Sequence, residues 1–178
     1  MKSGCAKTFA WLVVASGAFP FATHAIQINQ ADPLHRVGPA DISCVIQAAV
    51  RQGVPANVLL ALASVEGGKN GQLVRNTNGT YDVGHFQINT IHFAPGGIFG
   101  HIKRADAAWR GCYNAELAAF FLRKRLDAPT GKDYWTRVAN YHSATPKFNS
   151  IYRAKLVPLA ESWGHWLQAN YNTAISYN

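Results

Sequence analysis

The chain has 178 residues, of which 48% are hydrophobic and 15% are charged. This length suits one domain with a substantial core, and the composition excludes an intrinsically disordered chain. The formal net charge is +8, and it falls to +6 without Lys2 and Lys7 near the N-terminus. For an exported protein this balance favours an acidic partner such as a cell wall or anionic lipid. No basic run alternates with stacking aromatic residues, so we expect no nucleic-acid partner.

The first residues have the pattern of an export signal. Two lysines precede an apolar stretch at residues 9–22, and small residues around Ala25 suit a cleavage site. The alternative is an uncleaved membrane anchor, but Gly17 and Pro20 interrupt a run that is already short for a membrane span. We expect residues 1–25 to be removed on export to the periplasm, which leaves no stable membrane span.

Beyond this signal the chain keeps two cysteines, Cys44 and Cys112. An even number of cysteines in an oxidising compartment favours a disulfide between them. The alternative is a pair of free, buried thiols. No spacing of cysteine and histidine residues matches a zinc site, so we expect no metal.

Two helices are predicted after a polar lead-in at residues 26–38. From Pro39 apolar side chains recur at helical spacing, and proline suits the first turn of a helix. A second helix fits residues 55–66, and Gly67-Gly68 ends it because glycine tolerates the left-handed backbone of helix ends. The apolar positions of the two helices are Ile42, Val45, Ile46, Ala49, Val50, Val58, Leu62 and Val65.

A β-hairpin is predicted next. Asn78-Gly79 is a preferred dipeptide for a two-residue turn, and it lies between strands expected at residues 73–77 and 80–86.

The rest of the chain is predicted to be helical. Asn114 is expected to cap a helix that runs to Leu126. The features expected after it are helices at 134–143 and 148–157, a kink or helix end at Pro158, and a tail in which Trp163 and Trp166 pack on the body. Residues 39–178 therefore form one domain that is mainly α with a small β-hairpin, an α+β fold.

Glu66 is the first candidate for catalysis. It occupies the last turn of the predicted helix at 55–66, where the helix dipole disfavours a further negative charge. Its neighbours Leu62, Ala63 and Val65 are apolar, and burial among them acts in the same direction. Both effects raise the pKa of the carboxyl group, as a general acid working near neutral pH requires. The alternative is a solvated glutamate at a helix end.

Asp82 supplies a second carboxylate on the return arm of the predicted hairpin. A hairpin folded over a helix end can hold it opposite Glu66. Two carboxylates in unlike surroundings, one apolar and one polar, are the arrangement that cleaves glycosidic bonds. The alternative role of Asp82 is to bond backbone amides near the turn.

Three residues after Asp82 are candidates for binding a sugar. Gly84 is expected to leave a gap where a sugar ring lies against the backbone. Gln87 and Asn89 are expected to alternate on one strand face, with donors and acceptors suited to acetamido and hydroxyl groups. The alternative is that these two amides bond within the protein and tie the hairpin to a helix.

These segments resemble a known family. A glutamate at a helix end, a hairpin and then Gly84-His-Phe-Gln-Ile-Asn89 are similar to the lysozyme-like peptidoglycan lytic transglycosylases of the soluble type, which carry Gly-Leu-Met-Gln-Ile-Asn there. Residues 75–82 (RNTNGTYD) also resemble the animal-type lysozymes, where an acid at the position of Asp82 assists the glutamate. Further likeness lies in residues 109–114 (WRGCYN) and 139–143 (ANYHS), and Tyr152 stands where the family has a later tyrosine.

The resemblance implies a lysozyme-like fold and roles for named residues. Glu66 would be the catalytic acid, Asp82 would assist it, and Tyr141 and His142 would lie near the scissile sugar. For these last two residues the alternatives are a core tyrosine with a satisfied hydroxyl and a structural histidine. The chain departs from the family at Gly67, where serine is common, and at residues 85, 86 and 142, but at no residue that the chemistry requires.

The implied reaction cleaves the β-1,4 bond between N-acetylmuramic acid and N-acetylglucosamine in peptidoglycan. Glu66 would protonate the glycosidic oxygen and the muramyl C6 hydroxyl would attack, which leaves a 1,6-anhydro end and needs neither metal nor cofactor. Two alternatives stay open: hydrolysis by water, as in a muramidase, which Asp82 favours, and a non-catalytic wall-binding scaffold. Within the family the chain is most similar to small exported enzymes that serve secretion, conjugation or pilus machines. The partners that this implies are glycan strands and components of such a machine.

Overall fold

The computed structural model describes residues 34–171, and helices dominate this part of the chain. The helices are α1 (Ile42–Gln52), α2 (Ala56–Glu66), the 3-10 helix η1 (Thr90–Phe93), α3 (Arg104–Trp109), α4 (Gly111–Asp127), α5 (Tyr134–Ala139) and α6 (Pro146–Tyr171). The strands β1 (Leu73–Arg75), β2 (Tyr81–Val83) and β3 (Ile88–Asn89) form one antiparallel sheet in the order β1-β2-β3. The predicted α+β class, mainly α with a small β element, is confirmed.

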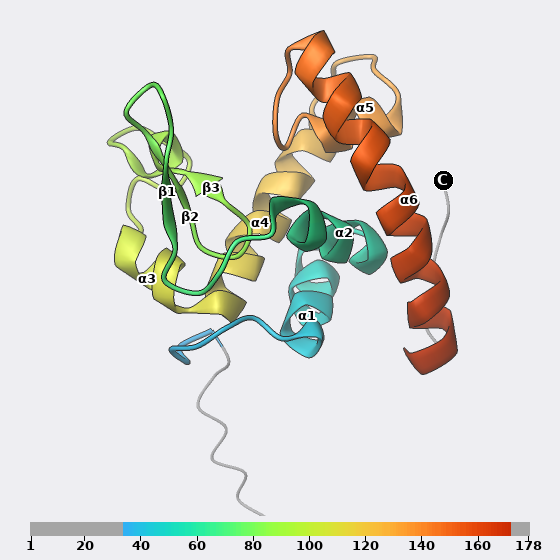
Figure 1. The fold of residues 1–178 in the computed structure, drawn as a ribbon, viewed down its shortest axis with the longest axis horizontal. Coiled ribbons are helices and arrows are strands. Elements are labelled where there is room, and N and C mark those ends of the chain that lie inside the picture. Colours follow the sequence, from blue (N-terminus) through green and yellow to red (C-terminus); the bar gives the residue numbers. More distant parts are fainter. Residues whose placement is uncertain (1–33, 172–178) are drawn as a thin grey trace, which may run out of the picture.

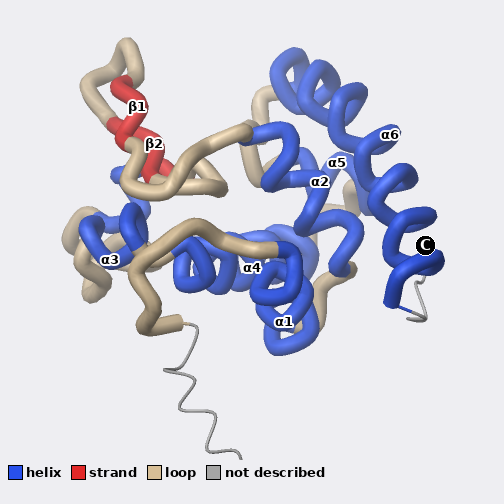
Figure 2. The backbone as a smooth tube through the Cα atoms, turned by 60° about the horizontal axis from the view of Figure 1, so that its bottom comes forward, coloured by secondary structure: helices blue, strands red, loops and turns tan. Residues whose placement is uncertain are grey.

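The central helix is α4, which contacts α1, α2, α3 and α5. The sheet and α3 lie on one side of the molecule, and α2 and α6 lie on the other (Figure 1). In the turned view β1 and β2, in red, again lie on the same side as α3 and away from α6 (Figure 2). The largest fully buried core side chains are Leu59, Leu62, Phe86, Phe99, Leu122, Leu156 and Leu167.

The ends of the first two helices follow from the local sequence. The Asp41 carboxylate accepts a hydrogen bond of 2.8 Å from the Cys44 amide and caps α1. The helix therefore begins after Asp41, not in the turn that starts with Pro39. Gly67 has a left-handed backbone (φ 60°) and ends α2 directly after Glu66, which confirms the predicted stop.

The hairpin turn is longer than predicted. The Asn76 amide donates to the Thr80 carbonyl (2.8 Å), and the Gly79 amide donates to the Asn76 carbonyl (3.1 Å). Gly79 has a left-handed backbone with φ 82°. The prediction of a two-residue Asn78-Gly79 turn is therefore wrong, because these bonds close a three-residue loop of the kind that ends in a left-handed glycine.

A second turn, which the sequence analysis did not predict, joins β2 to β3. Gly84 (φ 69°) and Gln87 (φ 48°) both have left-handed backbones. The backbone amide of Gln87 donates to the Gly84 carbonyl at 3.2 Å. The expected strand at 80–86 is therefore cut short at Val83. Gln87 lies in the turn and Asn89 on β3, so they do not alternate on one strand face as predicted.

Two helical boundaries after residue 130 also differ from prediction. Helix α5 ends at Ala139, and α6 continues through Pro158 as far as Tyr171, so Trp163 and Trp166 lie on this helix rather than in a tail. Pro158 and Ala154, whose carbonyl loses its intrahelical donor, are both exposed. Water can bond that carbonyl, which explains why the helix tolerates the proline.

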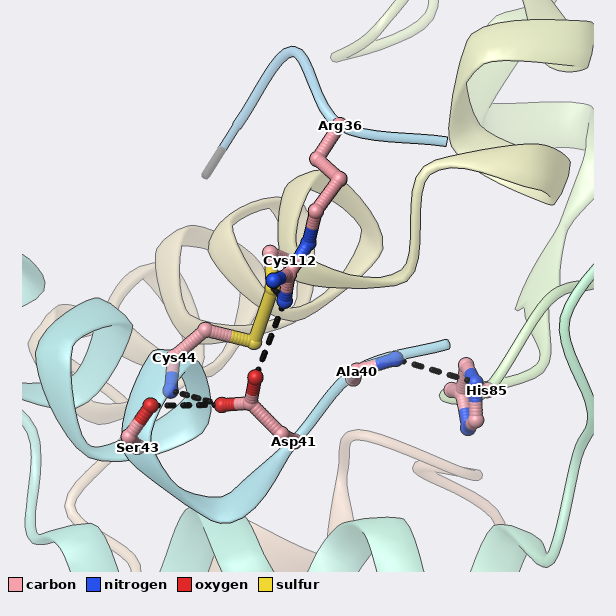
Figure 3. Close-up of polar contacts among 7 residues, drawn as sticks. All are labelled: Arg36, Ala40, Asp41, Ser43, Cys44, His85 and Cys112. Atoms are coloured by element: carbon pink, nitrogen blue, oxygen red, sulfur yellow. Dashed lines mark hydrogen bonds and ion pairs between the residues drawn. A yellow bond between two sulfur atoms is a disulfide. The ribbon is translucent and has the colours of Figure 1, made fainter. Parts of the chain in front are cut away.

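The predicted disulfide between Cys44 and Cys112 is confirmed. It joins α1 to α4, with both residues buried and their Cα atoms 5.5 Å apart (Figure 3). Arg36 lies over it, pairs with the Asp41 carboxylate at 2.9 Å and places Nη2 3.8 Å from the Cys112 sulfur. The bond is compatible with an oxidising compartment.

The predicted signal at 1–25 and the first part of the lead-in at 26–38 lie outside the described residues. The remainder of the lead-in is attached to the domain, because Gly38 forms an isolated bridge with Arg110 and the Arg110 guanidinium bonds the Leu34 carbonyl. Within residues 34–171, no helix combines the length and the apolar character that crossing a membrane requires.

Candidate active site

A groove of about 710 Å³ brings together most of the predicted site residues. Its walls come from the end of α2, the hairpin tip, β2, the turn before β3, β3 itself, η1, the second half of α4, the connection between α5 and α6, and the start of α6. Of the seven catalytic and sugar-binding candidates, six line this groove: Glu66, Asp82, Gln87, Asn89, Tyr141 and His142. Gly84 does not line it.

Glu66 projects into this groove from the last position of α2. Burial raises the pKa of its carboxyl group to about 7, a hydrogen bond from Tyr152 opposes this rise, and the negative charge of Asp82 adds to it. Desolvation is the largest of these effects, as expected for a carboxyl group among apolar neighbours. A group with this pKa can donate a proton near neutral pH and take it back.

Tyr152 of α6 holds the Glu66 carboxyl group in place. Its hydroxyl donates to Glu66 Oε1 at 2.5 Å. Burial and then the neighbouring Glu66 charge raise the pKa of Tyr152 far above its ordinary value, so the phenol keeps its proton and acts as a donor. From the sequence Tyr152 was part of the family resemblance, but no role in the site was predicted for it.

Asp82 on β2 lies directly opposite Asn89 on β3. The Asn89 side-chain amide donates to Asp82 Oδ1 at 2.8 Å and to Thr80 Oγ1 at 2.9 Å, and its oxygen accepts from the Ile91 amide at 3.0 Å. Asn89 therefore fixes the Asp82 carboxylate at the groove and starts η1. This agrees with the alternative stated for Asn89, in which its amide bonds within the protein. Its partners, however, lie in and beside the sheet and at the start of η1.

The turn between β2 and β3 packs against the end of α2 and against α4. A Cβ atom at Gly68 would lie 2.1 Å from the Gly84 carbonyl oxygen, so only glycine allows the turn to approach α2 this closely. The side-chain amide of Gln87 also donates to the Gly84 carbonyl, through Nε2 at 2.7 Å, which uses part of the hydrogen-bonding capacity of this side chain inside the protein.

The gap expected beside Gly84 is filled by protein. A Cβ atom there would lie 2.9 Å from both the Ala107 carbonyl oxygen and Asn114 Nδ2. The prediction of a sugar ring against this backbone is therefore wrong, because α3 and α4 occupy the space. Gly84 shapes the site through the turn instead.

Asn114 supports this turn from inside α4, so its predicted role as a helix cap is wrong. It is fully buried, its Oδ1 accepts from the Phe86 amide at 2.8 Å, and its Nδ2 donates to the Val83 carbonyl at 3.2 Å. These bonds satisfy backbone groups that the short strands leave without partners. A buried asparagine has no local sequence signal that distinguishes it from a cap.

Tyr141 and His142 line the groove from the segment after α5. Tyr141 is buried, and its hydroxyl donates to the Phe86 carbonyl at 3.0 Å. This agrees with the alternative stated for it, a core tyrosine whose hydroxyl has a partner within the protein. His142 stacks on Tyr152 with ring centroids 4.8 Å apart and an interplanar angle of 4°. His142 therefore contacts the tyrosine that bonds the Glu66 carboxyl group.

One group of possible metal ligands occurs among residues 34–171. It comprises Asp41, Cys44 and Cys112. The two sulfur atoms are bonded to each other (Figure 3), so the disulfide form of this cluster offers no thiolate to a metal.

The groove thus combines a carboxyl group of raised pKa with a second carboxylate, and the buried Tyr152 donates a hydrogen bond to the first of them. No protein-family model matches the chain, and no curated protein matches it significantly.

Proposed function

We propose that this protein is a peptidoglycan lytic transglycosylase with a lysozyme-like fold. The single observation that carries the proposal is Glu66. Its carboxyl group has a pKa raised to about 7 and lies in a groove that also contains the Asp82 carboxylate. This is the pattern of a general acid in enzymes that cleave glycosidic bonds. The choice of peptidoglycan follows the family resemblance of residues 84–89 and 139–143.

In the proposed reaction the protonated Glu66 donates its proton to the glycosidic oxygen as the bond from that oxygen to the muramyl C1 breaks. The departing N-acetylglucosamine keeps the proton as its 4-hydroxyl group. The muramyl C6 hydroxyl then attacks C1 and returns a proton to Glu66, which closes a 1,6-anhydro ring. No water is consumed, and the enzyme ends in its starting protonation state.

Asp82 stabilises the positive charge that develops at the anomeric carbon in this scheme. It also favours the second candidate, a muramidase that delivers water in place of the C6 hydroxyl. The two reactions differ in their products, because hydrolysis leaves reducing muramyl ends and transglycosylation leaves anhydro ends.

The test is digestion of purified cell wall by the wild type, by Glu66→Gln and by a matched control, Glu161→Gln. Glu161 is an exposed residue of α6 outside the groove. We expect the wild type and the control to release anhydro ends, detected by mass spectrometry, and Glu66→Gln to lose at least about 100-fold in rate. Reducing ends would establish the muramidase. Lysis that survives in Glu66→Gln would refute Glu66 as the acid, and wall binding without any lysis by the wild type would establish a scaffold.

We also propose that the protein works in the periplasm and opens the wall locally for a secretion, conjugation or pilus machine. The disulfide supports an oxidising compartment. Without Lys2 and Lys7 of the expected signal, 15 basic and 9 acidic residues remain, and this net charge of +6 favours binding to an anionic wall. The link to such machines follows the family resemblance. Deletion of the gene is expected to lower assembly of the machine. As a control, the wild-type protein should restore assembly in the deletion strain, and Glu66→Gln should not.

A further inference from the structure

Arg125 gives the groove a permanent positive charge. It belongs to the last turn of α4 and is the one lysine or arginine among the described residues that line the groove. The same groove contains the carboxyl groups of Glu66 and Asp82.

Within residues 34–171 the Arg125 guanidinium has no carboxylate partner. Its Nε atom is buried and has no hydrogen-bond partner. Arg51 and Arg123, by contrast, each pair with a carboxylate at 2.7 Å. Burial also lowers the pKa of Arg125, although an arginine remains charged at any physiological pH.

The Arg125 guanidinium lies against the aromatic wall of the groove. The guanidinium carbon of Arg125 lies 4.4 Å from the centroid of the Phe121 ring, and this ring lies 5.4 Å from that of Tyr141. The negative charges of Glu66 and Asp82 both raise the pKa of the Tyr141 hydroxyl after burial. Arg125, Phe121, Tyr141 and the two carboxyl groups all line the same groove.

A half-buried charge without a partner costs free energy unless a ligand supplies the partner. The Phe121 ring compensates part of this cost through a cation-π contact. The planar guanidinium is suited to a carboxylate, which it binds with two parallel hydrogen bonds. An anionic group on a bound ligand would complete the site.

On the basis of the proposed function, we propose that Arg125 binds a carboxylate carried by the muramyl residue of the substrate, which makes the enzyme selective for anionic strands over uncharged polymers of N-acetylglucosamine. Two parts of peptidoglycan carry this chemistry. One is the lactyl carboxylate, which is free in strands that have lost their peptides. The other is a carboxylate of the stem peptide in intact strands.

The test uses the wild type, Arg125→Gln and the control Lys124→Gln. It measures cleavage of peptide-bearing and peptide-free strands, and binding of chito-oligosaccharides. Lys124 is the adjacent exposed residue of α4 and does not line the groove. We expect Arg125→Gln to lower kcat/KM about tenfold to hundredfold on carboxylate-bearing strands, mainly through KM, and to leave binding of chito-oligosaccharides unchanged. A loss confined to one type of strand identifies the lactyl group or the peptide as the source of the carboxylate.

A second measurement does not depend on the folding of a variant. Conversion of the strand carboxylates to neutral amides is expected to lower kcat/KM of the wild type by the same factor. Equal activity on amidated and untreated strands would overturn the inference, as would an equal loss in Arg125→Gln on all substrates. A wild type that cleaves no strand would overturn the proposed function and this inference together, whereas cleavage with unchanged selectivity in Arg125→Gln overturns the inference alone.

Discussion

The Tyr152 hydroxyl of α6 donates a hydrogen bond of 2.5 Å to the Glu66 carboxyl group at the end of α2, across 86 residues of sequence. This bond lowers the pKa of Glu66, whereas burial, the larger effect, raises it to about 7. The position and the protonation of the proposed acid therefore depend on how α6 packs against α2. A bond between the Asn57 side chain and the Ala160 carbonyl (3.1 Å) ties the same two helices together.

Tyr152→Phe is expected to move the alkaline limb of the pH-rate profile to higher pH. The active enzyme carries a protonated Glu66, so activity falls as pH rises through the Glu66 pKa. Loss of the tyrosine donor removes the effect that lowers this pKa. We also expect the maximal rate to fall about tenfold, because the carboxyl group loses its fixed position.

The measurement is kcat/KM for wall fragments between pH 5 and about pH 9. Tyr134→Phe is the matched control, since Tyr134 lies on α5 outside the groove. An alkaline limb that stays in place or moves to lower pH would show that the bond does not act on Glu66 in this way.

Asp82→Asn is expected to move the alkaline limb in the opposite direction. The negative charge of Asp82 raises the pKa of Glu66, so its removal lowers this pKa. The rate is expected to fall, but anhydro ends should remain the main product because the C6 hydroxyl attacks without a second carboxylate. The same pH profile and mass spectrometry of the ends check both points. A loss as complete as that in Glu66→Gln would mean that Asp82 is obligatory.

Glu66 is expected to make the stability of the protein depend on pH. Its folded-state pKa of about 7 exceeds the ordinary value of 4.5, so the folded state binds the proton more tightly than the unfolded state. Its contribution is fully present below pH 4.5 and is lost as pH rises to 7. The free energy of unfolding of Glu66→Gln, relative to that of the wild type, should therefore rise by up to about 3 kcal/mol as the pH increases across this window.

Urea unfolding of both proteins at several pH values measures this difference in free energy of unfolding. Glu161→Gln serves again as the control, because Glu161 is exposed. A difference between Glu66→Gln and wild type that does not change with pH would contradict the raised pKa.

Removal of the disulfide is expected to destabilise the domain without altering the site. Cys44 and Cys112 are separated by 68 positions, and a loop of this length corresponds to about 4 kcal/mol in the chain-entropy model, as an upper figure. The double variant Cys44→Ser, Cys112→Ser should lose about 2–4 kcal/mol in urea unfolding and keep the pH-rate profile of the wild type. An unchanged midpoint in urea would show that the bond contributes no stability.

The places of Glu66 at the end of α2 and of Asp82 on a hairpin strand could be predicted because their signals are local. The apolar spacing and Gly67 define the end of α2, and an Asn-Gly pair marks the hairpin next to Asp82. The second turn left no such signal, because β3 has two residues and a period cannot be read from so short a segment. Pro158 suggested a helix end, but the rest of α6 is held by buried residues such as Leu156 and Leu167.

The contacts that tune the site could not be predicted, because they join distant parts of the chain. Tyr152 reaches Glu66 through the packing of α6, and Asn114 reaches the turn through the packing of α4. The same packing fills the space beside Gly84. Sequence patterns describe the faces of single helices, whereas these contacts depend on the angles and distances between helices.

The most direct test of the account is the titration of the Glu66 carboxyl group by carbon-13 NMR, with Glu66→Gln used to assign its signal. The account predicts a midpoint at about pH 7, and a lower midpoint in Asp82→Asn. A midpoint near the ordinary value of 4.5 would contradict it, because Glu66 would then be ionised at neutral pH and could not donate the proton.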